Sequence, residues 1–496
     1  MNLIEKYHDA FIRFAQNEAF FNGNKRYSYC EFSEIINGSR NLLEQQPGFA
    51  PKMPVGVLCT ENAETYAAIF AIWFAGGYFV PLHPASPNQF NAEIIQKNNI
   101  RFVFAPPETT ITTFGENVKL LPNSGFKTAE FKPVCSREED DYLYVLNTSG
   151  STGTPKNVPI SLKNITAFVE GFLDLYPELN ETDKFLQTYD LTADAAFTGY
   201  LIPLLIGAAV YTLPAGQFKP FGVAKMLNEN PVSWVQVTPS LLACLHPFFA
   251  SLWFPKITHF HFGGEALPLT LAEEWRKHIP NAEISNVYGP TETTVTATIY
   301  KCLPNEQLKS KNNIISIGKP LINVIAKISK NSLGTANTGE LLIGGEQVMN
   351  QYLFTDNQPF EIFEIEGIQT KFYPSGDLVE IDGEGFLYYH GRKDDQVKIN
   401  GYRVDLIEVE NSVRELVDGR NVAAAVIEIS PGLHHLLVFI ENYQENTDEI
   451  LRQLTEKLPY YKIPEKLIGV VAFPLSNSGK TDRKKLVANY QQSILS

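Results

Sequence analysis

Residues 142–156, which read YLYVLNTSGSTGTPK, constrain the fold and the chemistry of this chain more than any other segment. The apolar positions Leu143 and Val145 alternate with their neighbours and predict a strand, which runs into a loop of glycine, serine and threonine. Glycines let the backbone approach a ligand closely, and successive N–H groups with hydroxyls form a cradle for anions. Lys156 adds a positive charge on a flexible stem. The segment therefore predicts a polyphosphate site.

This loop differs from the Walker phosphate loop, because Thr154 and Pro155 separate Gly153 from the lysine. The alternative is a flexible polar surface loop, which glycine, serine and threonine alone would favour. A strand that leads into the loop and a lysine that leads out of it favour the phosphate site.

The length of 496 residues exceeds what one hydrophobic core supports, so we expect two or more domains. Hydrophobic residues make up 44% of the chain, which is ordinary for a soluble protein. The formal net charge of −14 argues against a nucleic-acid partner, because such binding depends on basic surfaces.

The five cysteines are scattered and form no C-x-x-C pair, which favours a reducing compartment over a disulfide or zinc framework. The N-terminus carries charges where a signal peptide needs an apolar core. The apolar run 67–82 is interrupted at Gly76 and ends at Pro81, so it predicts a buried helix and a strand and not a membrane span. We expect a cytoplasmic protein without a membrane partner.

The order of expected elements predicts an α/β fold. Strands at 55–59, 79–82 and 102–105 alternate with helices, which is typical of a parallel sheet covered on both faces. From about residue 314 to 393, short apolar runs with Gly and Asn turns predict a β-rich subdomain. We therefore expect a large N-terminal domain at 1–393 and a small, mobile α+β domain at 394–496.

Other segments carry weaker signals for nucleotide chemistry. In 286–294, NVYGPTETT, Tyr288 offers a flat face for a base and Glu292 could bind a divalent cation beside phosphates. Asp377 follows a tight turn, as carboxylates that hold ribose hydroxyls often do. Residues 391–403 are dense in charge and glycine and could equally form a solvated hairpin. Residues 474–484, PLSNSGKTDRK, could equally form a capped helix start.

In this order and over nearly the full length, these segments resemble the adenylate-forming superfamily of acyl-CoA synthetases, luciferases and nonribosomal peptide synthetase adenylation domains. The matching motifs are NTSGSTGTPK, YGPTE, SGDL, GRxDxQVK and NSGKxDR. The chain is similar in particular to amino-acid adenylation domains and to D-alanine–carrier protein ligases. It departs from the family pattern at flanking positions: Asn157, Pro374, Ser375 and Asn400.

The resemblance implies a two-step reaction that uses ATP and Mg²⁺. A substrate carboxylate attacks the α-phosphorus of ATP, pyrophosphate leaves, and the acyl group then passes to a phosphopantetheine thiol. Between the steps the C-terminal domain rotates about Asp394, which brings residues 398–403 to the site. Lys480 would bridge the substrate carboxylate and the α-phosphate, Thr291 would contact the α-phosphate, and Glu292 would hold Mg²⁺.

The resemblance also implies the ATP contacts. Residues 148–156 would hold the β- and γ-phosphates. Asn286 and Tyr288 would contact adenine, while Asp377 and Arg392 would contact ribose. The full set is Thr148, Ser149, Gly150, Ser151, Thr152, Gly153, Thr154, Lys156, Asn286, Tyr288, Gly289, Asp377 and Arg392.

For the substrate, matching to the family assigns the α-ammonium to Asp190, with a simple helix cap as the alternative. The side-chain pocket would be lined by Leu191, Asp194, Gln236, His261, Gly263, Val287, Val295 and Thr296. Its polar members favour a cationic or hydrogen-bonding substrate side chain. His259 and His261 could form a metal pair, although plain strand residues are the favoured interpretation. D-alanine ligases carry cysteine where Gly263 stands, which weakens D-alanine as the substrate.

The favoured hypothesis is an amino-acid adenylating ligase of nonribosomal peptide synthesis that serves a separate carrier protein, because the sequence ends soon after residue 486. An acyl- or aryl-CoA ligase and a D-alanine–carrier protein ligase remain alternatives. A catalytically inactive ATP-sensing scaffold is a third class. The presence of Lys480, Glu292 and Asp377 argues against it.

Overall fold

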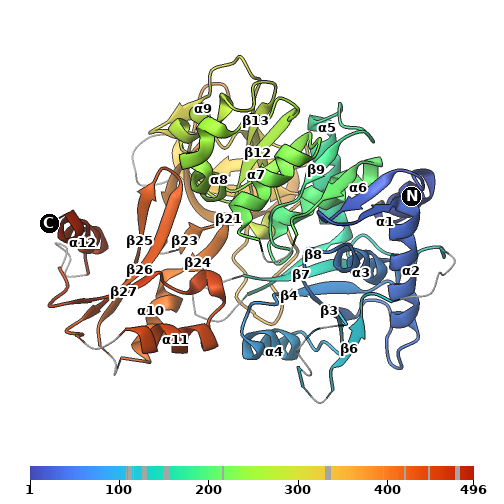
Figure 1. Ribbon diagram of the computed structural model, residues 1–496, viewed down its shortest axis with the longest axis horizontal. Coiled ribbons are helices and arrows are strands. Elements are labelled where there is room, and N and C mark those ends of the chain that lie inside the picture. The colour runs from blue at the N-terminus through green and yellow to red at the C-terminus, as the bar shows by residue number, and fades with distance from the viewer. Residues whose placement is uncertain are drawn as a thin grey trace.

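The computed structural model describes residues 1–107, 109, 114–115, 117–125, 131–148, 156–214, 217–329, 337–394, 396–417, 420–444, 447–474 and 481–495. Of the expected site residues, Lys480 and loop residues 149–154 lie outside these ranges. Figure 1 shows a larger part that contains the N-terminus and a smaller part, in orange to red, that contains the C-terminus.

The first sheet holds the strand predicted before the glycine loop. Its spatial order is β6 (Lys119–Pro122), β5 (Phe102–Ala105), β3 (Pro54–Leu58), β4 (Tyr78–Leu82), β7 (Tyr142–Thr148) and β8 (Lys156–Ser161). Neighbouring strands are parallel except β7 and β8, which pair antiparallel with Thr148 opposite Lys156. The two ends of the loop are therefore fixed beside each other.

The second sheet lies beside the first and is mostly parallel. Its order is β17 (Lys319–Pro320), β14 (Thr298–Cys302), β13 (Glu283–Tyr288), β12 (His259–Gly263), β11 (Trp234–Val237), β9 (Lys184–Leu186), β10 (Ala209–Tyr211), β1 (Glu18–Phe21) and β2 (Arg26–Ser28). The strands from β13 to β1 are all parallel, so their carboxyl ends share one edge. Ligands of such sheets bind at that edge.

Helix α3 (Ala63–Phe74) and strand β4 form the apolar run predicted to be a buried helix followed by a strand. Asn62 caps the helix by accepting a hydrogen bond from the backbone N–H of Thr65 at 3.0 Å. Residues 67–74 are at most 1% exposed. The ring of Phe70 lies 5.2 Å from those of Tyr7 and Phe11 in helix α1 (Leu3–Arg13), so α3 is the centre of the largest core. An all-apolar surface suits a helix that is covered on every side.

The other helices of the larger part connect or cover the two sheets (Figure 1). They are α2 (Tyr29–Glu44), α4 (Asn88–Lys97), α5 (Leu162–Leu175), α6 (Thr198–Ile206), α7 (Lys219–Glu229), α8 (Pro239–Leu245) and α9 (Leu269–Arg276), with 3₁₀ turns η1 (Asp194–Phe197), η2 (His246–Ser251) and η3 (Thr291–Thr293).

A β-rich sheet follows, in agreement with the change of character expected near residue 314. It contains β18 (Val324–Ile328), β19 (Thr338–Gly345), β21 (Ile368–Ile381) and β20 (Glu361–Ile365), with β22 (Leu387–Arg392) paired to β21. A short ribbon of β15 (Ser310–Lys311) and β16 (Ile314–Ile315) precedes it.

The smaller part has its own apolar core, drawn from Ile399 onward. It contains the hairpin β23 (Gln396–Ile399) and β24 (Tyr402–Asp405), the sheet β25 (Val422–Ser430), β26 (Leu433–Glu441) and β27 (Lys466–Val470), helices α10 (Leu406–Arg414), α11 (Asp448–Lys457) and α12 (Arg483–Leu495), and the turn η4 (Tyr460–Lys462). The domain boundary at 393/394 stays a prediction. The predicted α/β class is confirmed. Within the described ranges, no helix combines the length and apolar character needed to cross a membrane.

Candidate active site

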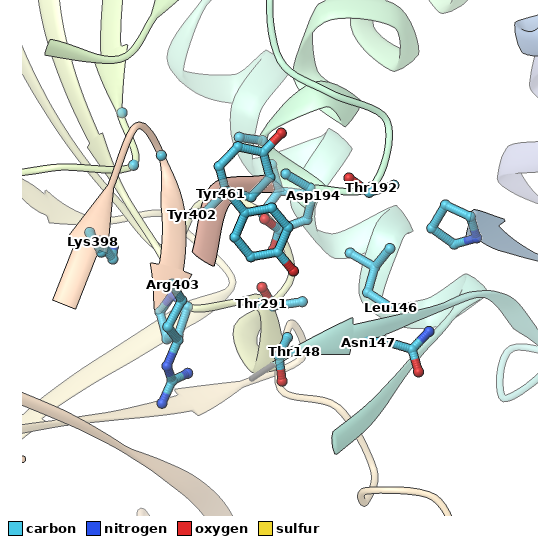
Figure 2. Close-up of a pocket in the computed structure, with 18 of the residues that line it drawn as sticks. Leu146, Asn147, Thr148, Thr192, Asp194, Thr291, Lys398, Tyr402, Arg403 and Tyr461 are labelled. Carbon is cyan, nitrogen blue, oxygen red and sulfur yellow. The ribbon is translucent and has the colours of Figure 1, made fainter. Parts of the chain in front are cut away.

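A cavity lies where the carboxyl ends of the parallel strands meet the β23–β24 hairpin. Leu146, Asn147 and Thr148 line it from the end of β7, and Gly263 and Val287 line it from β12 and β13. In Figure 2, Lys398 and Arg403 on the hairpin lie to one side of Asp194 and Thr291, while Leu146 and Asn147 lie to the other. The remaining lining residues include Pro81, His83, Ser86, Phe90, Asn91, Ile94, Thr192, Ala193, Ala195, Gly264, Pro290, Gly401, Tyr402 and Tyr461.

Many residues that the sequence assigns to ATP or substrate share this cavity. Those that line it are Thr148, Asp194, Gln236, Gly263, Val287, Gly289, Thr291, Val295, Thr296, Asp377 and Arg392. They come from both sheets and from the β-rich subdomain, so only the folded chain brings them together.

Asp194 begins the 3₁₀ turn η1 and exposes a charged group to the cavity. Its Oδ2 atom is buried and has no hydrogen-bond partner among the described residues. Burial raises the pKa of this carboxyl to about 6, while Thr291 and the backbone of Ala195 oppose the rise by hydrogen bonding. A buried carboxylate with an unpaired oxygen is a place for a cation from outside the protein.

Asp190 lies outside this cavity, on the wall of a second one. Lys219, the first residue of α7, holds its Nζ atom 3.3 Å from Oδ1 of Asp190. The hydroxyl of Tyr460 donates to Oδ2 at 2.8 Å. Although Asp190 is buried, which raises a carboxyl pKa, Lys219, His83 and Tyr460 bring the net shift below the usual value. Protein groups thus already pair with the carboxylate, and its position does not favour the expected ammonium contact.

Three other expected contacts do not line the cavity. Asn286 precedes Val287 on β13, and neighbouring strand residues face opposite sides. Its amide donates instead to the carbonyl of Ser316 at 3.0 Å. Leu191 is buried in the main core. His261 packs among aromatic rings such as Trp234, 4.6 Å away, and burial holds its pKa well below the usual value.

The expected ribose residues form one connected polar cluster. Asp377 on β21 accepts from the hydroxyl of Tyr288 at 2.5 Å and from Nη1 of Arg392 at 2.7 Å. Arg392 also donates through Nε to Asp394 at 2.6 Å, so the expected hinge residue is bonded to a cavity residue. Gln396 accepts from Nη2 of Arg392 at 3.1 Å. This carboxylate is oriented by charge-assisted bonds, as recognition of a diol requires.

Glu292 is buried directly beside Thr291 in the turn η3. Its Oε1 atom accepts from the hydroxyl of Tyr352 at 2.6 Å and lies 3.4 Å from Nη1 of Arg403. Burial would raise the pKa of Glu292, but Arg403 and Tyr352 lower it below the usual value, so the group is an anion.

The environment of Glu292 fits a divalent cation that brings its other ligands from phosphate and water. Its Oε2 atom is buried and unpartnered among the described residues. Lys156 lies nearby, with Nζ 5.1 Å from the centre of the Tyr352 ring. No group of three or more His, Cys, Asp or Glu side chains that could hold a metal occurs in the described ranges. Mg²⁺ often binds through one or two carboxylates and substrate phosphates, so one anionic oxygen is sufficient.

A strained turn presents Val295 and Thr296 to the cavity. Thr294 and Val295 have φ angles of 59° and 63°, which are costly for β-branched residues. The amide of Gln347 donates to the carbonyls of Thr293, Thr294 and Thr296 at 3.2, 3.1 and 2.8 Å, and the hydroxyl of Thr294 donates to the carbonyl of Gln347 at 2.6 Å. These buried bonds hold the turn.

Several cavity residues were not predicted from the sequence, among them His83, Asn91, Tyr402 and Tyr461. His83 follows the carboxyl end of β4, so the rule that ligands bind at strand carboxyl ends could have found it. Tyr402 and Tyr461 stack at a centroid distance of 4.2 Å, and they come from separate segments of the smaller part. No local signal marks that pair.

Comparisons with known proteins agree with this geometry. Residues 8–353 match the family described as AMP-binding enzyme. The chain is 30% identical to one of the plipastatin synthase proteins of Bacillus subtilis (strain 168) over 89% of its own length, which is 12% of that protein's length. It therefore spans only a small part of that relative.

Two solved structures have the same fold. The Vibrio cholerae adenylation domain AlmE, in complex with glycyl-adenosine-5'-phosphate, superposes with a TM-score of 0.84 at 23% identity, covering 99% of this chain and 98% of AlmE. PA1221, a nonribosomal peptide synthetase protein with adenylation and PCP domains, gives a TM-score of 0.84 at 23% identity over 98% of this chain and 84% of its own. The chain belongs to the AMP-binding enzyme family, the adenylate-forming superfamily, and has the fold of nonribosomal peptide synthetase adenylation domains.

Proposed function

We propose that this enzyme activates an amino acid with ATP to give an aminoacyl-AMP and pyrophosphate, and then transfers the aminoacyl group to the phosphopantetheine thiol of a separate carrier protein. The observation that carries the amino-acid assignment is the unpaired oxygen of Asp194 in the cavity that also contains Thr291 and Asp377. Acyl and aryl acids have no ammonium for that carboxylate. The relatives support the carrier, since PA1221 contains a PCP domain.

In the first step, an oxygen of the substrate carboxylate forms a bond to the α-phosphorus and the bond to the pyrophosphate oxygen breaks. Asp194 would hold the α-ammonium, and Thr291, which lines the same cavity, would contact the α-phosphate. Asp377 and Arg392 would hold the ribose. Bound at Glu292, Mg²⁺ would neutralise the charge that develops on the phosphate oxygens.

The side-chain end of the cavity supports a substrate that donates a hydrogen bond. Gln236 is 3% exposed, and its Oε1 atom has no partner among the described residues. A side chain larger than hydrogen at Gly263 would meet Cγ2 of Val287 at 2.6 Å, so glycine is required there. The cysteine of D-alanine ligases would not fit without a shift of Val287. We therefore favour a polar amino acid over D-alanine.

The second cavity supports the carrier step. It shares Ala193, Gly401 and Tyr402 with the first, so the two are adjacent. We propose that the thiol enters through the second cavity and attacks the carbonyl carbon, with AMP leaving. Lys398 and Arg403 would face the leaving phosphate.

The first experiment is amino-acid-dependent ATP–pyrophosphate exchange with the protein amino acids, their D-forms and common diamino and β-amino acids. We expect one polar amino acid to respond strongly. Exchange supported only by fatty or aryl acids, followed by consumption of coenzyme A, would overturn the amino-acid assignment in favour of a CoA ligase.

Lys480→Ala is expected to lower the adenylation rate by about a hundredfold or more, because one preorganised charge at a reacting phosphate contributes this much. Amino-acid binding should change little. Stopped-flow pyrophosphate release measures the rate, and a near-normal rate would remove Lys480 from the proposed chemistry. The neighbouring Lys484→Ala serves as the control.

The pH profile should report Asp194. Its pKa of about 6 in the free enzyme means that lower pH protonates the carboxyl and removes the charge opposite the ammonium. Glu292 and Lys398 are the charged groups that act on it. We expect kcat/KM for the amino acid to be constant above about pH 7 and to fall roughly tenfold per pH unit below the pKa. The kcat profile should break at lower pH, because a bound ammonium lowers the pKa. A flat kcat/KM profile down to about pH 5 would contradict the assignment.

A further inference from the structure

Asp190 joins the two parts of the molecule through Tyr460. Asp190 follows β9 in the larger part, and Tyr460 lies in η4 of the smaller part. The hydroxyl of Tyr460 donates to Oδ2 of Asp190 at 2.8 Å. That hydroxyl also lies 2.6 Å from the hydroxyl of Tyr402, which lines the reaction cavity. The carboxylate is thus linked through Tyr460 to a cavity residue of the smaller part.

Glu265 makes a second connection, on the other side of Gly401. Its Oε2 atom accepts from the backbone N–H of Ser240 at 2.9 Å, and its Oε1 atom accepts from the backbone N–H of Gly401 at 3.0 Å. Glu265 is buried, and Gly401 stands at the tip of the β23–β24 hairpin with a φ of 82°. A Cβ atom at Gly401 would lie 2.8 Å from Thr238, so the hairpin tip is seated closely against the larger part.

The two connections share one consequence. The hairpin carries Lys398, Tyr402 and Arg403 into the reaction cavity. Asp190 and Glu265 hold the hairpin and its neighbour Tyr460 in that place, whereas neither carboxylate lines the reaction cavity. Their contacts exist only while the smaller part keeps this orientation.

We propose that Asp190 and Glu265 are positioning residues for the thiol-transfer step, which they favour by holding the smaller part in the orientation seen here. The inference rests on the proposed two-step function. In the first step Lys480 must reach the same cavity, so the contacts made by the hairpin must be released. Loss of either carboxylate contact therefore weakens transfer selectively and spares adenylation.

The test compares the two steps in Tyr460→Phe and Glu265→Gln. Pyrophosphate exchange measures adenylation, and single-turnover transfer from preformed aminoacyl-AMP to free pantetheine measures the second step. We expect transfer to fall by about tenfold in each variant, the effect of one buried hydrogen bond, while exchange stays within about twofold. Tyr490→Phe removes a hydroxyl on α12, far from the hairpin in the fold, and Glu273→Gln alters an exposed carboxylate. Both controls should transfer normally. Equal loss in both steps, or unchanged transfer, would overturn the proposal.

Double variants separate positioning from general damage. Asp190→Ala combined with Tyr460→Phe should lose no more transfer than Tyr460→Phe alone, because both remove one contact. Tyr460→Phe combined with Glu265→Gln should lose about a hundredfold, since the contacts are separate. Additive loss in the first pair would contradict the contact between Asp190 and Tyr460.

A distance measurement tests the orientation without any activity. Spin labels at Asp174→Cys in α5 and Glu456→Cys in α11, in a chain with Cys30→Ser, report on the separation of the two parts. We expect Tyr460→Phe to broaden the distance distribution relative to Tyr490→Phe. An unchanged distribution would overturn the proposal even where exchange fails. Absent exchange with a broadened distribution would instead contradict the proposed function and leave the positioning contact standing.

Discussion

Asp194→Asn is expected to lower kcat/KM for the amino acid by about a thousandfold. The substitution keeps the shape of the side chain but removes the charge that the ammonium needs inside a buried cavity. Loss of one partner from a buried charge pair costs about 2–5 kcal/mol, and about 4 kcal/mol corresponds to this factor. Amino-acid-dependent exchange measures the loss, and calorimetric titration should give an unchanged affinity for ATP.

The matched control is Asp190→Asn, which changes the other carboxylate of the same segment. Lys219 and Tyr460 pair with Asp190 in place of a ligand, so amino-acid exchange should stay within about threefold of the parent. A loss of less than about tenfold in Asp194→Asn, together with a large loss in Asp190→Asn, would return the ammonium to Asp190.

These two aspartates show where the sequence is informative and where it is not. The segment QTYDLTAD contains both, four residues apart, and nothing local decides which one faces the substrate. The decision depends on Lys219 and on Tyr460, which is 270 positions away in the chain. Only the tertiary structure brings these partners to Asp190.

Elsewhere, local physics was sufficient. The apolar run 67–82 could be interpreted as a buried helix and strand, because glycines interrupt it and proline ends it. Strand alternation also contains a result that motif matching overlooks. Asn286 and Val287 are adjacent on β13, so only one of them can face the cavity, and the structure selects Val287. A motif match says which segment approaches a ligand, whereas the period of the strand says which of its side chains does.

The chemistry at Glu292 likewise follows from its surroundings. Arg403 reaches Glu292 from the smaller part, across the cavity, at 3.4 Å. The same carboxylate can therefore pair with a cation of the protein or with Mg²⁺ on the phosphates. Because Arg403 comes from the hairpin, movement of the smaller part changes which cation Glu292 meets. This exchange of partners lets one buried anion serve both steps without remaining uncompensated.

Glu292→Gln is expected to lower the adenylation rate by about 500-fold, because the amide cannot supply the negative charge that holds the metal ion beside the phosphates. The Mg²⁺ concentration for half-maximal rate should rise at the same time. Tyr352→Phe is the matched control: it removes the 2.6 Å hydrogen bond to Oε1 but keeps the charge, so the rate should fall less than about tenfold. Stopped-flow pyrophosphate release over a series of Mg²⁺ concentrations measures both quantities. The melting temperature should fall by only a few degrees in Glu292→Gln, because Arg403 still donates through Nε to Gln396 at 2.6 Å. A normal rate at ordinary Mg²⁺, or a reduced rate with unchanged Mg²⁺ dependence, would show that Glu292 only balances Arg403.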